Sequence, residues 1–140
     1  MSKIIILILF GLWIWSFIKF KRKMKYFMVM TAYLQQVVGN NPSPENSLRL
    51  SGALIEIQHY KDAYSILEKL LKQCPYHPNI EQMKINMEFC KNPVPGTHQP
   101  KNFNHSWWHN FLLVRLGKRR YNFLSEEDYL RTNSIMRQMS

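Results

Sequence analysis

The chain has 140 residues, the length of one domain with appendages, and a formal net charge of +10. Its two cysteines, Cys74 and Cys90, are too few for the disulfide framework of a small secreted domain. We interpret them as small buried hydrophobes in a reducing compartment. The positive charge lies in two blocks without acids, six cations in residues 1–25 and five in residues 101–122. Each block adjoins an apolar stretch, which favours an anionic membrane surface over nucleic acid as the charged partner.

The first apolar stretch, residues 4–18, contains no charged side chain. A helix that crosses a bilayer needs about 20 residues, and Lys19 and Phe20 extend the stretch if the lysine reaches the interface. Its later aromatic side chains suit the headgroup level: Trp13, Trp15 and Phe17. The alternative is a cleaved signal peptide, but no small-x-small cleavage site follows. We therefore predict an uncleaved transmembrane anchor with a basic juxtamembrane segment in residues 1–25.

The orientation of this anchor follows from the cations on its two sides. Only Lys3 and the amino terminus precede the apolar stretch, whereas five cations follow within seven residues: Lys19, Lys21, Arg22, Lys23 and Lys25. Cations flanking a membrane helix favour the cytoplasmic side. The pattern predicts a single-pass membrane protein whose bulk is cytoplasmic.

Residues 26–91 show helical periodicity throughout, which predicts an all-α fold. A stripe over residues 27–38 ends at a Gly-Asn-Asn-Pro turn, after which Ser43 is a candidate N-cap and Pro44 occupies the first helical position. The clearest amphipathic pattern runs from Ala63 to Leu71, with apolar residues at i, i+3, i+4, i+7 and i+8. A further helix is expected over residues 79–91.

Two of these helices begin with prolines 34 residues apart, Pro44 and Pro78. Between them, Tyr60-x-x-Ala63-x3-Leu67 followed by Pro75 resembles the second half of a tetratricopeptide repeat, a helix-turn-helix unit with a period of 34. One such unit covers residues 44–77. The chain departs from the family pattern at four positions: Ser47, Ser51, Leu54 and Leu67. An ordinary antiparallel helical bundle with this spacing is the alternative.

The resemblance implies a binding surface for a protein partner, because in this family the first helix of each hairpin lines a concave peptide-binding face. The residues that the resemblance places on this face are Leu48, Gly52, Ile55, Gln82 and Asn86. Leu48 and Gly52 stand where family members that hold an acidic peptide terminus have a lysine and an asparagine. An apolar or helical ligand therefore fits better than a carboxylate. A stack this short must also be capped by another segment or by a partner.

Residues 92–105 form a proline-rich linker that separates the helical module from residues 106–140, which begin with an aromatic and basic helix. This helix is too short and too polar to cross a bilayer. It either lies on the lipid surface or caps the open edge of the hairpins. The residues expected to act in either way are Trp107, Trp108, Phe111, Lys118, Arg119 and Arg120. A last helix is expected after Ser125, which starts a capping signature that reaches Asp128.

No pattern in the sequence indicates a reaction. It contains no phosphate-binding glycine loop, no Ser/His/Asp arrangement and no metal-ligand spacing, so we predict no catalytic residues, no metal, no cofactor and no small-molecule substrate. Two hypotheses for function remain. The first is a membrane-anchored adaptor or assembly subunit that holds a partner protein at the cytoplasmic membrane surface. The alternative is a lipid-surface or envelope-structural protein that acts through its basic aromatic segments.

Overall fold

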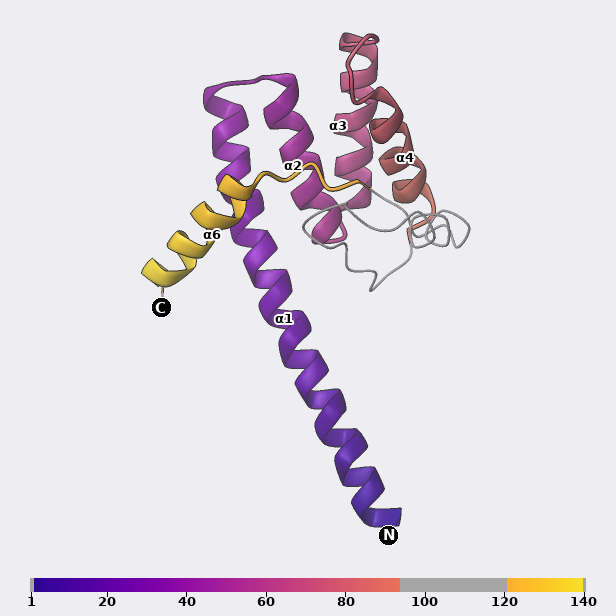
Figure 1. Ribbon diagram of the computed structural model, residues 1–140, viewed down its shortest axis with the longest axis vertical. Coiled ribbons are helices and arrows are strands. Elements are labelled where there is room, and N and C mark those ends of the chain that lie inside the picture. Colours follow the sequence, from indigo (N-terminus) through magenta and orange to yellow (C-terminus); the bar gives the residue numbers. More distant parts are fainter. Residues whose placement is uncertain (1, 94–120, 140) are drawn as a thin grey trace.

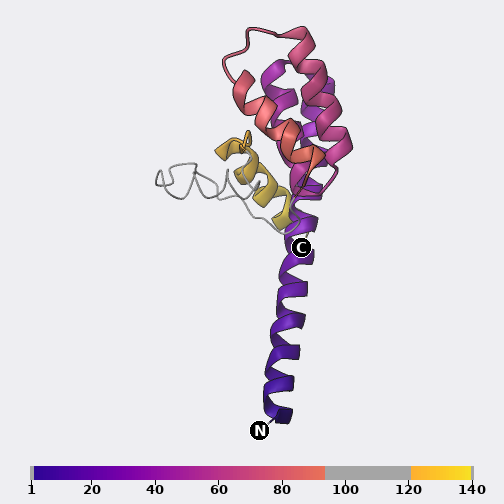
Figure 2. The same cartoon turned by 90° about the vertical axis from the view of Figure 1, so that its right-hand side faces the viewer.

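The computed structural model describes residues 2–93 and 121–139, and in these ranges all regular structure is helical, with no strand. The all-α prediction is confirmed for this part of the chain. In chain order the helices are α1 (Ser2–Asn40), α2 (Pro44–Glu56), α3 (Tyr60–Gln73), α4 (Ile80–Lys91) and α6 (Glu126–Met139). Figures 1 and 2 show a long α1 whose second half joins the shorter helices in a compact head.

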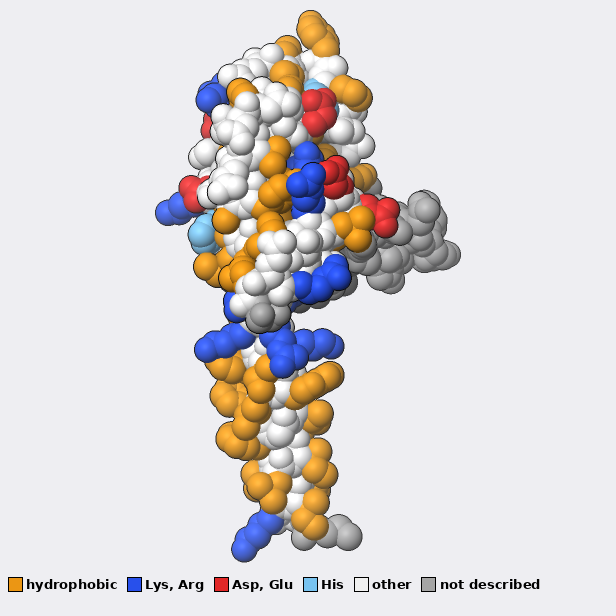
Figure 3. Space-filling view, turned by 90° about the vertical axis from the view of Figure 1, so that its left-hand side faces the viewer, with side chains coloured by type: hydrophobic (Ala, Val, Ile, Leu, Met, Phe, Trp, Pro, Cys, Tyr) orange, Lys and Arg blue, Asp and Glu red, His pale blue; other side chains and the backbone are white. Residues whose placement is uncertain are grey.

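Helix α1 has two halves with different surroundings. At 1.5 Å per residue its 39 residues extend about 58 Å, and no break separates the predicted anchor from the stem that follows. The large apolar side chains from Ile4 to Phe20 are all exposed, and they form the apolar rod of Figure 3. By length and composition, α1 could cross a lipid bilayer. The second half buries one stripe against the head: Phe27, Met30, Thr31 and Leu34.

Lysine and arginine side chains gather between these two halves (Figure 3). We call the cations at this point of the sequence the collar: Lys19, Lys21, Arg22, Lys23 and Lys25. Within it, the Lys23 ammonium lies 3.7 Å from the Glu56 carboxylate near the end of α2. This contact ties the base of the stem to the first hairpin.

Neighbouring helices pack side by side in the order α1, α2, α3, α4. Their apolar side chains form two clusters. The larger joins α1, α2 and the start of α3 to the end of α4, and its buried members are Phe27, Met30, Leu34, Leu50, Ala53, Leu54, Ile55, Ile57, Ala63, Phe89, Cys90 and Leu124. The smaller lies between α2, α3 and α4 and consists of Leu48, Leu67, Leu70 and Met83. The apolar face predicted from Ala63 to Leu71 is thus turned into the core, where Ala63, Leu67 and Leu70 are buried.

The local signals at the start of α2 are confirmed, whereas Pro78 lies in the turn before α4 and not at the first helical position. The Ser43 hydroxyl accepts a hydrogen bond of 3.2 Å from the Asn46 amide, and Pro44 follows at the first helical position. At the end of α2 the chain reverses with Gln58 in the left-handed region (φ 64°). There the amides of Gln58 and His59 donate to the carbonyls of Ile55 and Leu54, which is the Schellman arrangement.

Helix α6 returns to α1 from the far end of the sequence and packs on its stem. Before it, residues 121–125 run as a non-helical segment across α2 toward α4 (Figure 1). The carboxy-terminal part of the chain therefore lies on the face of the head where the resemblance led us to expect a partner protein.

Candidate functional site

The residues predicted to form a concave binding face are brought together, and this chain covers most of them itself. Leu48, Gly52 and Ile55 of α2 are buried, as is Asn86 of α4. Gln82, one turn before Asn86, is half-buried, and its buried Oε1 atom has no hydrogen-bond partner in residues 2–93 and 121–139. We call the surface formed by Leu48, Arg49, Gly52, Ile55, Met83 and Asn86 the covered face, and residues 121–128 the C-terminal segment.

Two adjacent apolar side chains fix the C-terminal segment to α2. Leu124 is buried and belongs to the larger cluster, whereas Phe123 packs against the smaller one. Gly52 sets how closely the segment approaches, since a Cβ atom at this position would lie 3.4 Å from Leu124 Cγ and 3.8 Å from its backbone nitrogen. The segment therefore bridges both clusters at a point where α2 presents no side chain.

Asn86 binds the backbone of the C-terminal segment at Tyr121. Its Nδ2 donates to the Tyr121 carbonyl oxygen at 3.0 Å, and its Oδ1 accepts from the Tyr121 amide at 2.6 Å. The side chain of Asn86 is fully buried, so these bonds satisfy polar groups that would otherwise be costly to bury. A carboxamide that pairs with both polar groups of one residue recognises an extended main chain whatever its side chain.

An ion pair anchors the other end of the C-terminal segment. Arg49 Nε donates to Asp128 Oδ1 and Oδ2 at 3.1 and 2.9 Å, and its Nη2 also donates to Oδ1. The Asp128 side chain is fully buried, whereas that of Arg49 keeps 20% of its surface exposed. Hydrogen bonding to Asp128 raises the pKa of the Arg49 guanidinium above its ordinary value, although partial burial opposes this rise. The pair is therefore a bidentate arginine–carboxylate contact.

Further contacts hold both members of this pair in place. Arg49 Nη1 donates to the Asn46 side-chain oxygen at 2.9 Å. Asp128 Oδ2 accepts from the Ser125 amide at 2.9 Å, and the Ser125 hydroxyl accepts from the Asp128 amide at 3.3 Å. The predicted capping signature is thus present, and the same Asp128 carboxylate also accepts the hydrogen bonds of Arg49.

Tyrosines join α6 to the stem of α1. The Tyr26 hydroxyl donates to the Tyr129 carbonyl oxygen at 3.1 Å, and their rings stack with centroids 6.4 Å apart. Burial, and then the neighbouring Tyr129, raise the pKa of Tyr26 above the ordinary tyrosine value. The Tyr129 hydroxyl in turn accepts a bond of 3.0 Å from Asn122 Nδ2. The α6 contact is thus more polar than the contacts among the first four helices.

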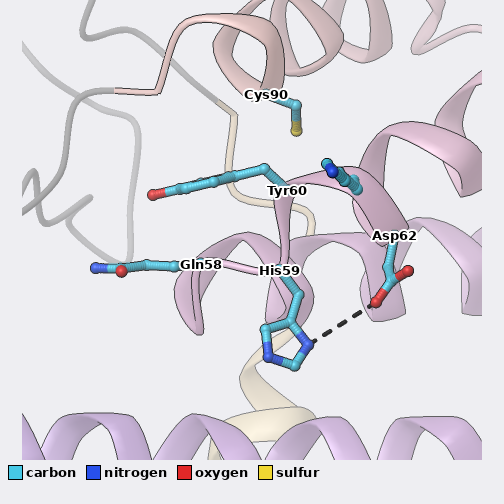
Figure 4. A pocket seen from close by; sticks show the side chains of 6 residues that line it. Gln58, His59, Tyr60, Asp62 and Cys90 are labelled. Atoms are coloured by element: carbon cyan, nitrogen blue, oxygen red, sulfur yellow. Dashed lines mark ion pairs between the residues drawn. The ribbon is translucent and has the colours of Figure 1, made fainter.

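Apart from the covered face, a cavity of about 510 Å³ opens beside the turn between α2 and α3 (Figure 4). In it, His59 Nδ1 and Asp62 Oδ2 lie 3.9 Å apart, and the buried Cys90 comes from the end of α4. His59 and Asp62 are both well exposed, and in residues 2–93 and 121–139 no three His, Cys, Asp or Glu side chains group together as metal ligands. The covered face carries the more specific geometry, so it is the candidate site.

The other predicted site residues, Trp107, Trp108, Phe111, Lys118, Arg119 and Arg120, lie outside the described residues. Sequence reasoning expected a cap over the hairpins, but it did not assign that role to the C-terminal segment. The available signal was short, an apolar pair at Phe123 and Leu124 directly before the capping signature. Arg49 carried no signal at all, because its partner lies 79 residues away.

Comparison with protein-family models, curated proteins and solved structures finds no match to this chain.

Proposed function

We propose that this protein is a single-pass, membrane-anchored adaptor or assembly subunit, non-catalytic, whose tetratricopeptide-like module holds a partner protein at the cytoplasmic membrane surface. The observation that carries the proposal is the covered face. Asn86 holds an extended main chain and Arg49 holds a buried carboxylate, on a head joined to a long apolar helix.

The anchor is supported by the continuous exposure of apolar side chains along the first half of α1. A soluble protein rarely exposes a patch of this size unless a membrane or a partner covers it. The 17 residues from Ile4 to Phe20, at about 1.5 Å each, match the hydrocarbon thickness only narrowly, and the aromatic residues near the end of this stretch suit the interface. The excess of cations after the apolar half supports a cytoplasmic location for the head.

The binding role is supported by the chemistry of the covered face. Repeat modules of this kind use side chains of a helical face to bind peptides, and here such side chains already bind an extended segment followed by a helix. The adaptor reading also explains why apolar contact, backbone recognition and a charge pair converge at one place without any catalytic group.

One observation favours the alternative, a lipid-surface protein. Lys19 Nζ lies 4.7 Å from the centroid of the Trp15 ring, and Lys21 Nζ lies 4.9 Å from that of Phe17. These cations lie over aromatic rings at the end of the apolar half, the arrangement that a headgroup layer favours. In that case the head is only a spacer, and the collar and the aromatic residues next to it bind the lipid surface.

Photocrosslinking in native membranes separates the two functions. A photoreactive residue replaces Gln82, beside the covered face, and in a matched variant it replaces Lys69, which is exposed on α3. The adaptor predicts that one protein is crosslinked from position 82 and not from position 69. It also predicts that this protein leaves the membrane fraction when residues 2–18 are deleted. Recovery of lipid alone from position 82 would favour the lipid-surface function.

A further inference from the structure

We propose that the C-terminal segment is an internal ligand of the covered face, and that the partner of this face presents the same chemistry: an extended aromatic–leucine pair that leads into a helix with an acidic first turn. The inference rests on the proposed function and deepens it, since it names the partner's recognition element and what the partner must displace.

The contacts of the C-terminal segment have the form of ligand contacts. They join residues 35 and 79 positions apart, Asn86 with Tyr121 and Arg49 with Asp128, and the helix that follows adds a contact over 103 positions, Tyr26 with Tyr129. None of them depends on local chain connection. An identical segment of another protein would therefore meet the same groups.

Three features of the covered face define what it selects. Asn86 binds the main chain at Tyr121, so this pair of hydrogen bonds does not depend on the side chain of that residue. The bare backbone of Gly52 admits the bulk of a leucine, and the cluster around Leu48 and Met83 admits an aromatic ring next to it. These positions select shape and apolar character at two adjacent residues.

Charge supplies the remaining selectivity. Arg49 keeps part of its surface in solvent, yet it holds a carboxylate that is fully buried. A ligand with a neutral residue there would cover the guanidinium without a counter-charge, and a basic residue would add repulsion. The acid must also lie four residues after the leucine, because the Ser125 cap turns the chain into α6 between them.

Occupation by the chain's own segment has a regulatory consequence. A ligand that belongs to the same chain as its binding face competes at an effective concentration that can reach the order of millimolar. A partner of micromolar intrinsic affinity therefore binds poorly until the segment leaves, since the apparent affinity falls with the fraction of open chains. Only a partner that matches the covered face closely, or that is present at high local concentration, therefore displaces the internal ligand.

The test uses the full chain in mild detergent and a fluorescent peptide of residues 121–139 as the probe. In the Asp128→Arg chain, Arg49 faces a cation, the segment is released and the covered face opens. Wild-type peptide should bind this chain at least about tenfold more tightly than it binds the wild-type chain. A peptide carrying Asp128→Arg should bind neither chain. In the Arg49→Asp/Asp128→Arg chain the ion pair is restored with reversed charges, so wild-type peptide should again be excluded.

A second release variant guards against loss of folding. Phe123→Ala/Leu124→Ala removes the apolar pair and leaves Arg49 intact, and it should also expose the covered face to the peptide. The proposal is overturned if either release variant keeps its helical circular dichroism and still fails to bind, or if all chains bind the peptide equally. Such a result would overturn the internal ligand but not the adaptor function, because the partner could bind another surface of the head. Peptide binding without any crosslinked partner in membranes would instead contradict the proposed function.

Discussion

Helix α2 has two faces that are covered in different ways. The face that carries Leu50, Ala53 and Leu54 packs against neighbouring helices through apolar side chains. The covered face holds the C-terminal segment through one leucine, one aromatic ring, a carboxamide and an ion pair. The first kind of contact depends mainly on buried area and shape, whereas the second depends on a few directional bonds. The difference teaches that one helix can be both a core element and a recognition element.

The largest effect should come from the apolar side of this comparison. Leu34 is fully buried where α1 packs on α2, so Leu34→Ala should destabilise the whole head by about 2–5 kcal/mol. Leu12→Ala removes the same atoms from the exposed half of α1 and should leave the melting of the head unchanged. Thermal melts of the full chain in detergent, followed by near-ultraviolet circular dichroism, compare the two. Equal melting of both variants would mean that the stem is not part of the core.

A smaller and more local effect should follow from the charged side. Arg49→Ala leaves the buried Asp128 carboxylate without its counter-charge, at a cost of about 3 kcal/mol. The C-terminal segment and α6 should open while the four other helices stay folded. Hydrogen exchange should therefore increase in residues 121–139 and not in α3. Arg131 is an exposed arginine near Glu127 on α6, and Arg131→Ala serves as the matched control. It should leave hydrogen exchange unchanged both in residues 121–139 and in α3.

The smallest of these effects concerns the backbone contact. Asn86→Ala removes both hydrogen bonds to Tyr121 and should weaken the docking of the segment by about 1–3 kcal/mol. Gln82→Ala, one turn earlier, removes an amide whose Oε1 has no hydrogen-bond partner among the described residues, and it should cost less. Limited proteolysis near Tyr121 reports the difference. Faster cleavage in the Gln82 variant than in the Asn86 variant would contradict the claim that Asn86 holds the backbone of the C-terminal segment.

Much of the fold followed from local pattern. The apolar periodicity gave the helices of the head, Ser43 and Ser125 marked helix starts, and the faces expected to be buried are buried. These features depend on residues within a few positions of one another, where spacing is informative. The continuity of α1 was also implicit, because both its apolar and its amphipathic halves favour a helix.

The cover over α2 could not be found in this way. Phe123 and Leu124 are too few to show a period, and Asp128 was interpreted only as part of the capping signature that starts at Ser125. Its second role depends on Arg49, which only the tertiary fold brings near. Leu48, Gly52, Ile55 and Asn86 were chosen by resemblance, which gave their common face but not the identity of the segment lying on it.

The most direct test of the account is a disulfide between Gly52 and Leu124. In a chain with Cys74→Ala and Cys90→Ala, the pair Gly52→Cys/Leu124→Cys brings two thiols within bridging distance if the segment lies on the covered face. Gly52→Cys/Leu130→Cys is the control, since Leu130 is exposed on α6. Mild oxidation in membranes, followed by mass spectrometry, should give an intrachain disulfide in the monomer for the first pair only. Free thiols in the first pair, or equal bridging in both, would contradict the claim that the chain covers its own binding face.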